Sequence, residues 1–234
     1  TIEELMSQGI PTVDVGGCTS QPSQAQFCIA TDVGNSAYLG TKELIKAMGG
    51  KGNIVHFTGL LVDPNTQIRM KAVERAVAET NGQVKLIQHL ADIDSQEAAD
   101  NKINALLAAQ KDQIDGIIST AYIPSVVGAT ALRNLGDKRI KMVGIDDDKI
   151  VLDAIKDGFL VGTMAQNPYG QAYVAAFALD KLRHGCQMNP DSPFLIDSGT
   201  FLIGPDKIST YADDLKTLTK DIQSTFVEKY MTCS

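Results

Sequence analysis

The sequence predicts an α/β fold in which parallel strands are covered by helices on both faces. Two observations support this prediction. Short, continuously apolar runs alternate with longer amphipathic stretches through most of the 234-residue chain. Glycine and asparagine residues at the junctions are typical of the turns between such segments. Strands that alternate with helices form right-handed βαβ units, and strands buried on both sides are apolar throughout.

Strands are expected where short β-rich runs are bounded by turn residues. After Gly185 the alternation gives way to two extended runs without an intervening helix. The expected strands are Ile10 to Val15, Asn53 to Thr58, Val84 to Gln88, Gly116 to Ser119, Ile140 to Ile145, Phe159 to Met164, and the runs 194–196 and 200–203.

Helices are expected where apolar residues recur with helical spacing. Ile2, Leu5 and Met6 have this spacing at the start of the chain, and Gly9 and Pro11 end that helix in the usual order. The sequence therefore opens inside a helix, which we interpret as a chain whose first part is missing. The other expected helices are Ser36 to Met48, Arg69 to Thr80, 95–110, 124–135, Lys149 to Lys156, Tyr169 to Arg183 and Tyr211 to Tyr230.

Composition and charge exclude several classes of protein. Hydrophobic residues make up 44% of the chain, and the sequence has no charge blocks or low-complexity runs. We therefore do not expect the chain to be mainly disordered. No apolar stretch approaches the roughly 20 residues that a membrane-spanning helix needs. The net charge of −7 repels phosphate backbones, which disfavours nucleic acid as a direct partner.

The catalytic and metal-binding motifs that we sought do not fit the sequence. The glycine-rich run at 49–52 lacks the spacing and the hydroxyl residue of a P-loop, and we interpret it as a helix-to-strand turn. His56, His89 and His184 lie far apart without a paired carboxylate motif. The acidic run at 146–148 is better explained by a pocket aspartate followed by a helix cap than by a metal site. We predict no catalytic residue, cofactor or metal.

The four cysteines are Cys18, Cys28, Cys186 and Cys233. Their even number, with one pair close in sequence around a polar loop, fits two disulfides formed in an oxidising compartment. Four buried reduced thiols are nearly as compatible with the sequence. If disulfides form, we expect Cys18 to pair with Cys28, and Cys186 with Cys233.

Polar residues follow each expected strand at its carboxyl end, where ligands bind in open parallel sheets. Except for the aspartates these residues are uncharged, so a phosphate has no cation to pair with. Carboxylate and amide groups can hold vicinal hydroxyls, and an aromatic ring can pack against C–H groups. We therefore predict a neutral polyhydroxylated ligand. The residues concerned are Thr58-Gly59, Ala91-Asp92, Thr120-Ala121-Tyr122, Asp146 to Asp148 and Ala165-Gln166-Asn167.

At these strand ends the chain resembles the type I periplasmic sugar-binding proteins, the ribose-binding family of ABC transporters. No single motif carries the resemblance, which depends on the order and spacing of stretches spread over most of the chain. These stretches are Thr31-Asp32-Val33-Gly34-Asn35 with Leu39-Gly40, Gly49 to Val55 with Arg69, Met142-Val143-Gly144-Ile145-Asp146, Ala154 to Gly158 and Thr163 to Pro168.

The resemblance implies ligand-binding roles for some residues, and it shows that other ligand residues of the family are replaced in this sequence. The family aspartate that holds sugar hydroxyls falls on Asp146, and its pocket glutamine falls on Gln166. Its ligand arginine falls near Asn65 or Gln67, and its pocket asparagine falls on Tyr122. The aspartate-arginine pair that follows the family's entering strand falls on the glycines at 16–17, so ribose itself is not implied. The candidate ligand-binding residues are Asp146, Gln166, Tyr122, Asn65, Gln67 and Asp92.

The family topology implies two Rossmann-like lobes joined by three hinge crossings, near Thr31, Gln166 and Ile203. Residues 1–31 and 167–203 are then the remnant of a first lobe, and residues 32–166 and 204–234 form the second lobe. About the first hundred residues of a typical member are absent on this reading. We expect either an upstream segment or a homodimer to complete the first lobe.

The function implied by the resemblance is that of a periplasmic solute-binding protein. Such a protein closes two lobes over a sugar or sugar alcohol and delivers it to an ABC transporter permease. The alternative is the effector-binding core of a lactose-repressor-type transcription regulator, which shares the fold. A small α/β enzyme is the third possibility, but it needs a nucleophile and base that we do not find.

Overall fold

The computed structural model describes residues 1–233, which fall into two compact units. Unit 1 contains Thr1–Asp32, Gln166–Thr200 and the chain from Ser209 onward. Unit 2 contains Val33–Ala165 and Phe201–Ile208. Among the described residues, no helix has the length and apolar character needed to cross a membrane.

Unit 2 is built on a six-stranded sheet with the order β10-β7-β6-β5-β3-β4. The five strands from β3 to β7 run parallel, whereas β10 joins the edge antiparallel to β7. The predicted α/β class is confirmed. The strands are β3 (Gly52–Phe57), β4 (Val84–Leu90), β5 (Gly116–Ser119), β6 (Lys141–Ile145), β7 (Gly162–Ala165) and β10 (Phe201–Ile203).

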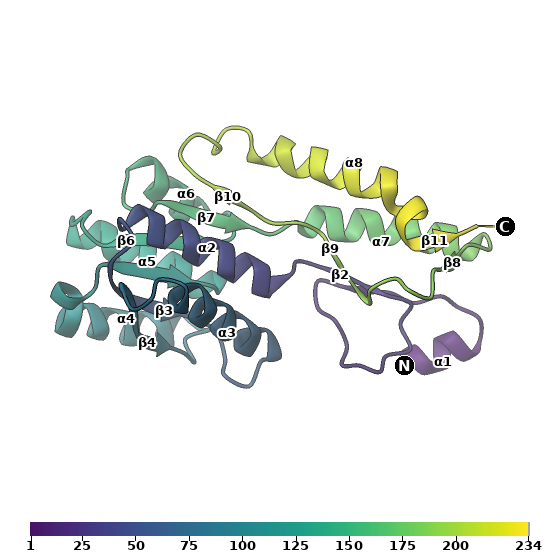
Figure 1. The fold of residues 1–234 in the computed structure, drawn as a ribbon, viewed down its shortest axis with the longest axis horizontal. Helices are drawn as coiled ribbons and strands as arrows, with labels where there is room; N and C mark the ends of the chain where they lie inside the picture. Colours follow the sequence, from purple (N-terminus) through teal and green to yellow (C-terminus); the bar gives the residue numbers. More distant parts are fainter. Residues whose placement is uncertain (234) are drawn as a thin grey trace. The chain divides into compact units, whose positions relative to one another are not determined.

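Helices cover both faces of this sheet (Figure 1). One face packs α2 and α3 against Ile54, Ile118 and Val143. The other face packs α4, α5 and α6 against Val55 and Phe57 among others. The helices are α2 (Val33–Ala47), α3 (Pro64–Ala78), α4 (Gln96–Gln110), α5 (Tyr122–Leu135) and α6 (Lys149–Lys156), with a short 3-10 helix at Lys111–Gln113.

The start of α3 differs from the expected helix, which began at Arg69. Asp63 caps the helix by accepting a hydrogen bond from the backbone N–H of Asn65, and Pro64 occupies the first turn. Both residues are typical of a helix start, because the cap satisfies a free N–H and proline needs none. The five extra residues, Pro64 to Ile68, add little more than one turn and place Arg69 inside the helix rather than at its beginning.

Unit 1 contains a three-stranded parallel sheet with the order β1-β2-β9. Its central strand is β2 (Cys28–Ala30), all of which is buried, and it was not predicted. The expected central strand, Ile10 to Val15, is reduced to the edge strand β1 (Asp14–Val15). The other elements are α1 (Ile2–Ser7), α7 (Pro168–Arg183), β8 (Gln187–Met188), β9 (Leu195–Asp197), α8 (Tyr211–Tyr230) and β11 (Met231–Thr232).

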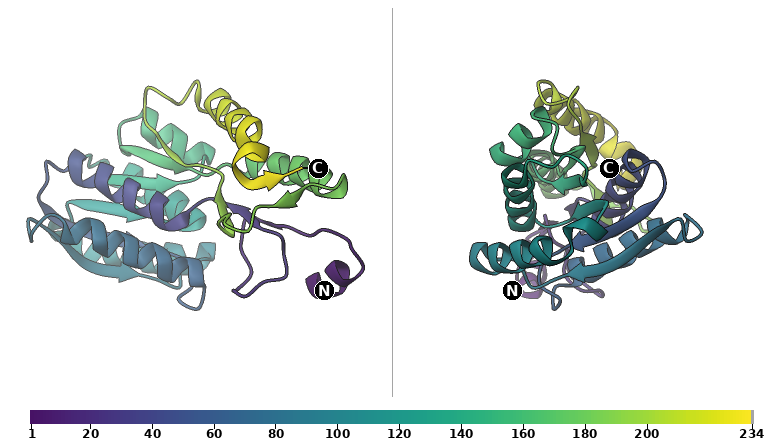
Figure 2. Two further views of the ribbon diagram at one scale, coloured as in Figure 1. Left: turned by 45° about the vertical axis from the view of Figure 1, so that its right-hand side comes forward. Right: turned by 90° about the vertical axis from the view of Figure 1, so that its left-hand side faces the viewer.

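The terminal helix α8 lies in unit 1, side by side with α7 (Figures 1 and 2). Phe226 of α8 is fully buried, and its ring centroid lies 5.5 Å from that of Phe27. Phe177 of α7 packs against the same ring. This placement differs from our expectation that 204–234 belong to the second lobe. The aromatic contacts explain the difference, because Phe226 completes the core beneath β2.

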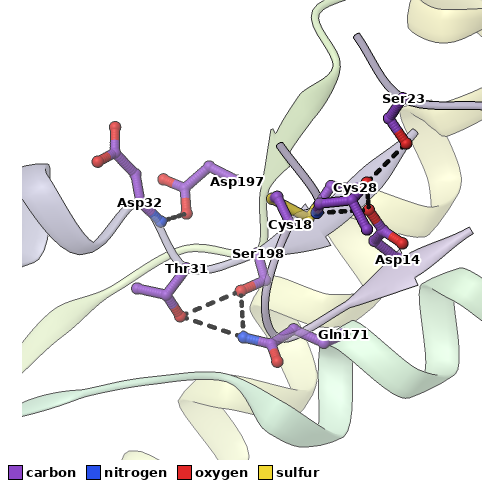
Figure 3. The surroundings of a disulfide bond; sticks show 10 residues. Asp14, Cys18, Ser23, Cys28, Thr31, Asp32, Gln171, Asp197 and Ser198 are labelled. Atoms are coloured by element: carbon purple, nitrogen blue, oxygen red, sulfur yellow. Dashed lines mark hydrogen bonds between the residues drawn. A yellow bond between two sulfur atoms is a disulfide. The ribbon is translucent and has the colours of Figure 1, made fainter. Parts of the chain in front are cut away.

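Two disulfides join Cys18 to Cys28 and Cys186 to Cys233, both within unit 1, so the expected pairing is confirmed. The first links the central strand β2 to the loop after β1, close to Asp14 (Figure 3). The second links the segment that follows α7 to the end of the described chain, beside the short β8–β11 pair.

Candidate ligand-binding site

The carboxyl ends of the parallel strands in unit 2 surround a small pocket. Ser36 lies in the first turns of α2, Arg69 reaches the pocket from α3, and Thr120 follows β5. Apolar side chains of β6 and β7 close its floor. The pocket is lined mainly by Ser36, Arg69, Ser119, Thr120, Ile145 and Met164.

Arg69 is a cation in the pocket lining, and Lys102 donates to the carbonyls of Ala91 and Asp92 after β4. The expectation that the strand ends have no cation nearby is therefore wrong, because both side chains reach this edge from helices.

Burial lowers the pKa of the Arg69 guanidinium below the ordinary value, while the carboxylates of Asp146, Asp63 and Asp94 oppose that shift. Three carboxylates around one guanidinium leave the neighbourhood acidic, so a phosphate gains little by binding here. Such a mixture of donors and acceptors suits uncharged hydroxyl groups.

Asp146 follows β6 directly and has a left-handed backbone, with φ of 67°. Its N–H donates to the carbonyl of Met164 at 2.9 Å, and its carbonyl accepts the Thr163 hydroxyl at 2.7 Å. Aspartate tolerates this conformation better than most residues do. The backbone therefore fixes where the carboxylate of Asp146 leaves the sheet.

Tyr122 begins α5 and exposes about half of its side chain. Its hydroxyl donates to Oδ2 of Asp148 at 2.7 Å, and this bond raises the pKa of the phenol. Asp148 also caps α6 by accepting the N–H of Ile150, which confirms the predicted helix cap. The ring of Tyr122 is thus tethered by its hydroxyl while one side remains exposed.

Gln67 and Asp92 are engaged in holding the loop between β3 and α3. Nε2 of Gln67 donates to the carbonyl of Leu61 at 2.7 Å, and Oδ1 of Asp92 accepts the N–H of Leu61 at 3.0 Å. Asp92 has a left-handed backbone, and its N–H donates to the carbonyl of Gly59. Asn65 lies in the first turn of α3, half-buried, where its N–H meets the Asp63 cap.

Gln166 directly follows β7 and belongs to unit 1, whereas the other five candidates belong to unit 2. Nearby in unit 1, Thr31, Ser198 and Gln171 form a buried network, with Nε2 of Gln171 donating to both hydroxyls at 3.0 to 3.2 Å (Figure 3). This network fixes the chain segment that leaves β2.

The architecture of unit 2, with polar and charged residues at the carboxyl ends of its parallel strands, is that of a type I periplasmic binding protein. The chain belongs to the periplasmic binding protein domain family, whose model matches residues 1–185. Members of this family bind solutes, and neither the family nor the relatives found for this chain are enzymes.

Two curated proteins are similar in sequence. A xylitol-binding protein of Mycolicibacterium smegmatis is 27% identical over 199 residues, which cover 85% of this chain and 56% of that protein. A D-apiose import binding protein of Paraburkholderia graminis is 24% identical, covering 83% of this chain and 62% of that protein. The chain thus spans little more than half the length of these relatives.

The fold is shared with solved structures. A sugar-binding protein of a sugar ABC transporter from Bacillus halodurans superposes with a TM-score of 0.79 at 21% identity. The match covers 90% of this chain and 74% of that one.

Proposed function

We propose that the protein binds a small neutral polyhydroxylated solute, a sugar or sugar alcohol, in the manner of the solute-binding proteins of ABC transporters. The single observation that carries this proposal is the match of the family to residues 1–185. The chemistry around the pocket supports it, since the Arg69 guanidinium can donate and the nearby carboxylates, among them Asp146, can accept and disfavour an anion.

We propose further that the protein works in the periplasm and passes its solute to a membrane permease. The named relatives include an import binding protein and a sugar ABC transporter component, which supports this assignment. Two disulfides within unit 1 fit an oxidising compartment. The alternative of a transcription regulator is not favoured, because the relatives are named as binding and import proteins.

The test is a thermal-shift screen followed by calorimetry with xylitol, D-apiose, D-arabinose and D-allose. A ligand present at 100 times its dissociation constant stabilises its site by about 2.7 kcal/mol, which is readily detected. Glucose 6-phosphate serves as the anionic comparison. We expect a neutral member of the panel to bind and the phosphate not to bind. Stabilisation by the phosphate alone, or by none of the compounds, contradicts the proposal.

A further inference from the structure

A row of hydrogen-bonded side chains crosses unit 2 from its surface to the pocket. Oε1 of Glu74 lies 3.1 Å from Nε2 of His89, and Nδ1 of His89 lies 2.8 Å from Nδ1 of His56. Nε2 of His56 lies 2.7 Å from the hydroxyl of Thr120, which lies 3.3 Å from that of Thr58. The proposed function does not explain why two histidines stand in this row.

The ends of the row fix the direction of its hydrogen bonds. The Glu74 carboxylate can only accept, so His89 must donate from Nε2. A neutral imidazole donates from one nitrogen and accepts at the other. With both rings neutral, His56 therefore donates from Nδ1 to His89, and its Nε2 accepts the proton of Thr120. Thr120 then has no proton left to donate to Thr58.

One additional proton on the histidine pair reverses this arrangement. A charged His89 donates from both nitrogens, so Nδ1 of His56 becomes an acceptor and its proton moves to Nε2. His56 then donates to Thr120, whose hydroxyl is free to donate to Thr58. The Thr120 and Thr58 hydroxyl oxygens lie 3.3 Å apart, so this donation is within hydrogen-bond reach.

We propose that His56 and His89 are positioning residues that form a proton-responsive pair, and that the charge of this pair sets the direction of the Thr120 hydroxyl at the pocket. Thr120 follows β5 and lines the pocket beside Arg69. In the neutral state its oxygen keeps lone pairs for a ligand hydroxyl. In the charged state it already accepts from His56 and is a poorer acceptor.

The surroundings disfavour an additional proton on His56 and put a carboxylate against His89. Burial, with smaller contributions from the charges of His89 and Arg69, lowers the pKa of His56 well below its ordinary value. His89 comes from β4, is partly exposed and contacts the Glu74 carboxylate of α3. Arg69, also on α3, is the other charged group facing His56, and Thr120 on the β5 side is neutral.

Helix α2 packs on the same face of the sheet, and its Lys46 pairs with its own Glu43 at 3.6 Å, at the exposed surface. Its Tyr38 hydroxyl and Lys42 ammonium both bind the carboxylate of Glu79 at the outer surface. The charged groups that face the histidine pair are therefore Glu74, on the outer side, and Arg69, on the side of the pocket.

The direct test is ¹⁵N NMR of the three imidazole rings, which needs no ligand. At high pH we expect His56 to carry its proton on Nδ1 and His89 on Nε2. On acidification the proton of His56 should move to Nε2 as His89 becomes charged. Exposed His184 in unit 1 is the internal reference. A His56 tautomer that stays the same while His89 titrates overturns the proposal.

Two partly exposed positions allow variants without disturbing the buried ring. Glu74→Gln removes the carboxylate and should move the tautomer change to lower pH, because the charged ring loses an opposite charge. Glu97→Gln, at an exposed carboxylate on α4 of the same unit, is the matched control and should leave it in place. Equal shifts in both variants, or none in Glu74→Gln, contradict the assigned role of Glu74.

The consequence for binding rests on the proposed function and is measured with xylitol. Between pH 8 and pH 5.5 we expect the affinity to fall about fivefold, the equivalent of one neutral hydrogen bond. His89→Asn should abolish this dependence, whereas Glu97→Gln should retain it. Unchanged affinity across this range overturns the effect on the pocket. Absence of binding at both pH values by xylitol and by every other neutral compound of the panel counts against the proposed function, whereas the NMR experiment tests the histidine pair independently.

Discussion

Asp146 combines a left-handed backbone with a carboxylate that influences Arg69. Asp146→Asn keeps the shape and tolerates the same backbone, but it removes the charge and one strong acceptor. We expect the affinity for the neutral solute identified by the screen to fall by about 1–3 kcal/mol, because a ligand hydroxyl loses its partner in a partly buried setting. Isothermal titration calorimetry measures the change.

The matched control is Asp147→Asn, which alters the adjacent, exposed carboxylate. We expect it to leave the affinity within experimental error, since an exposed charge interacts weakly with the pocket. Equal losses in both variants would mean that Asp146 acts only through overall charge, and no loss in either would remove Asp146 from the site.

The positions of the candidate residues, although not their roles, were partly predictable from the sequence. Asp146, Tyr122 and Asp92 follow strands, and strand ends are recognisable from the run of apolar residues before them. That these three side chains bind a ligand stays a prediction. Arg69 was not recognised as a pocket residue, because it lies within a helix rather than after a strand. If the Asp63-Pro64 pair is taken as the start of α3, Arg69 lies one helical turn after Asn65, on the same face of the helix.

At the scale of secondary-structure elements, β3 carries a buried histidine among apolar neighbours. Burial lowers the pKa of His56 in the folded state, whereas the unfolded chain has the ordinary value of 6.5. Below that pH the unfolded chain binds more protons than the folded chain. The contribution of neutral His56 to the stability of unit 2 is therefore fully present above about pH 6.5 and is lost as the pH decreases. Hydrogen exchange of β3 and β5 amides at pH 7.5 and pH 5 measures this loss.

Unit 1 supplies the comparison in the same sample. Its described part contains His184, which is exposed, so its amides should lose less protection over that interval. Equal losses in the two units, or no loss in unit 2, would show that His56 does not govern the acid sensitivity.

Element boundaries were predictable where turns and caps are strong, and less so where a strand is short. Lys149–Lys156 and Tyr211–Tyr230 agree with the expected helices to the residue. Strand β2 was missed because Cys28–Ala30 is only three residues long and follows a polar loop. Its strand character comes from pairing with β1 and β9 and from burial, which no local pattern reveals.

At the scale of the whole molecule, the two disulfides stabilise one unit only. The bridges close chain segments of 10 and 47 residues, for which loop entropy predicts about 3 and about 4 kcal/mol of stabilisation. Replacing Cys186 and Cys233 by alanine should therefore destabilise unit 1 more than replacing Cys18 and Cys28. Denaturant unfolding followed by hydrogen exchange resolves the two units.

Unit 2 is the internal control, because both bridges lie outside it. Its unfolding midpoint should stay unchanged in both double variants. Mass spectrometry of unreduced peptides establishes the pairing first, and four free thiols in the native protein would contradict both the bridges and the argument for an oxidising compartment.

The assignment of α8 was the largest error in the expected organisation, and its cause lies at this scale. The amphipathic pattern of Tyr211–Tyr230 predicts a helix but does not indicate which core its apolar face covers. Phe226 joins a cluster with Phe27 and Phe177, residues distant in sequence, and the Cys186–Cys233 bridge fixes the end of the same segment.

The small sheet of unit 1 leads to a prediction about association. Its outer strands, β1 and β9, are two and three residues long and each has an edge that is not paired within the β1-β2-β9 sheet. Val15 and Leu195 on these strands are 46% and 39% exposed. Exposed strand edges with apolar side chains favour pairing with another chain. Multi-angle light scattering should give a mass above 25.1 kDa that rises with concentration.

A lysine at the strand edge tests whether association uses this sheet. Val15→Lys should lower the mass toward that of one chain, because a charged side chain opposes edge pairing. Val62→Lys introduces the same charge at a more exposed valine in unit 2, 88% accessible, and should leave association unchanged. A constant mass of one chain at all concentrations contradicts the prediction. Association lost only in Val62→Lys would move the contact to the loop that precedes α3, because short edge strands would then contribute too little to hold two chains together.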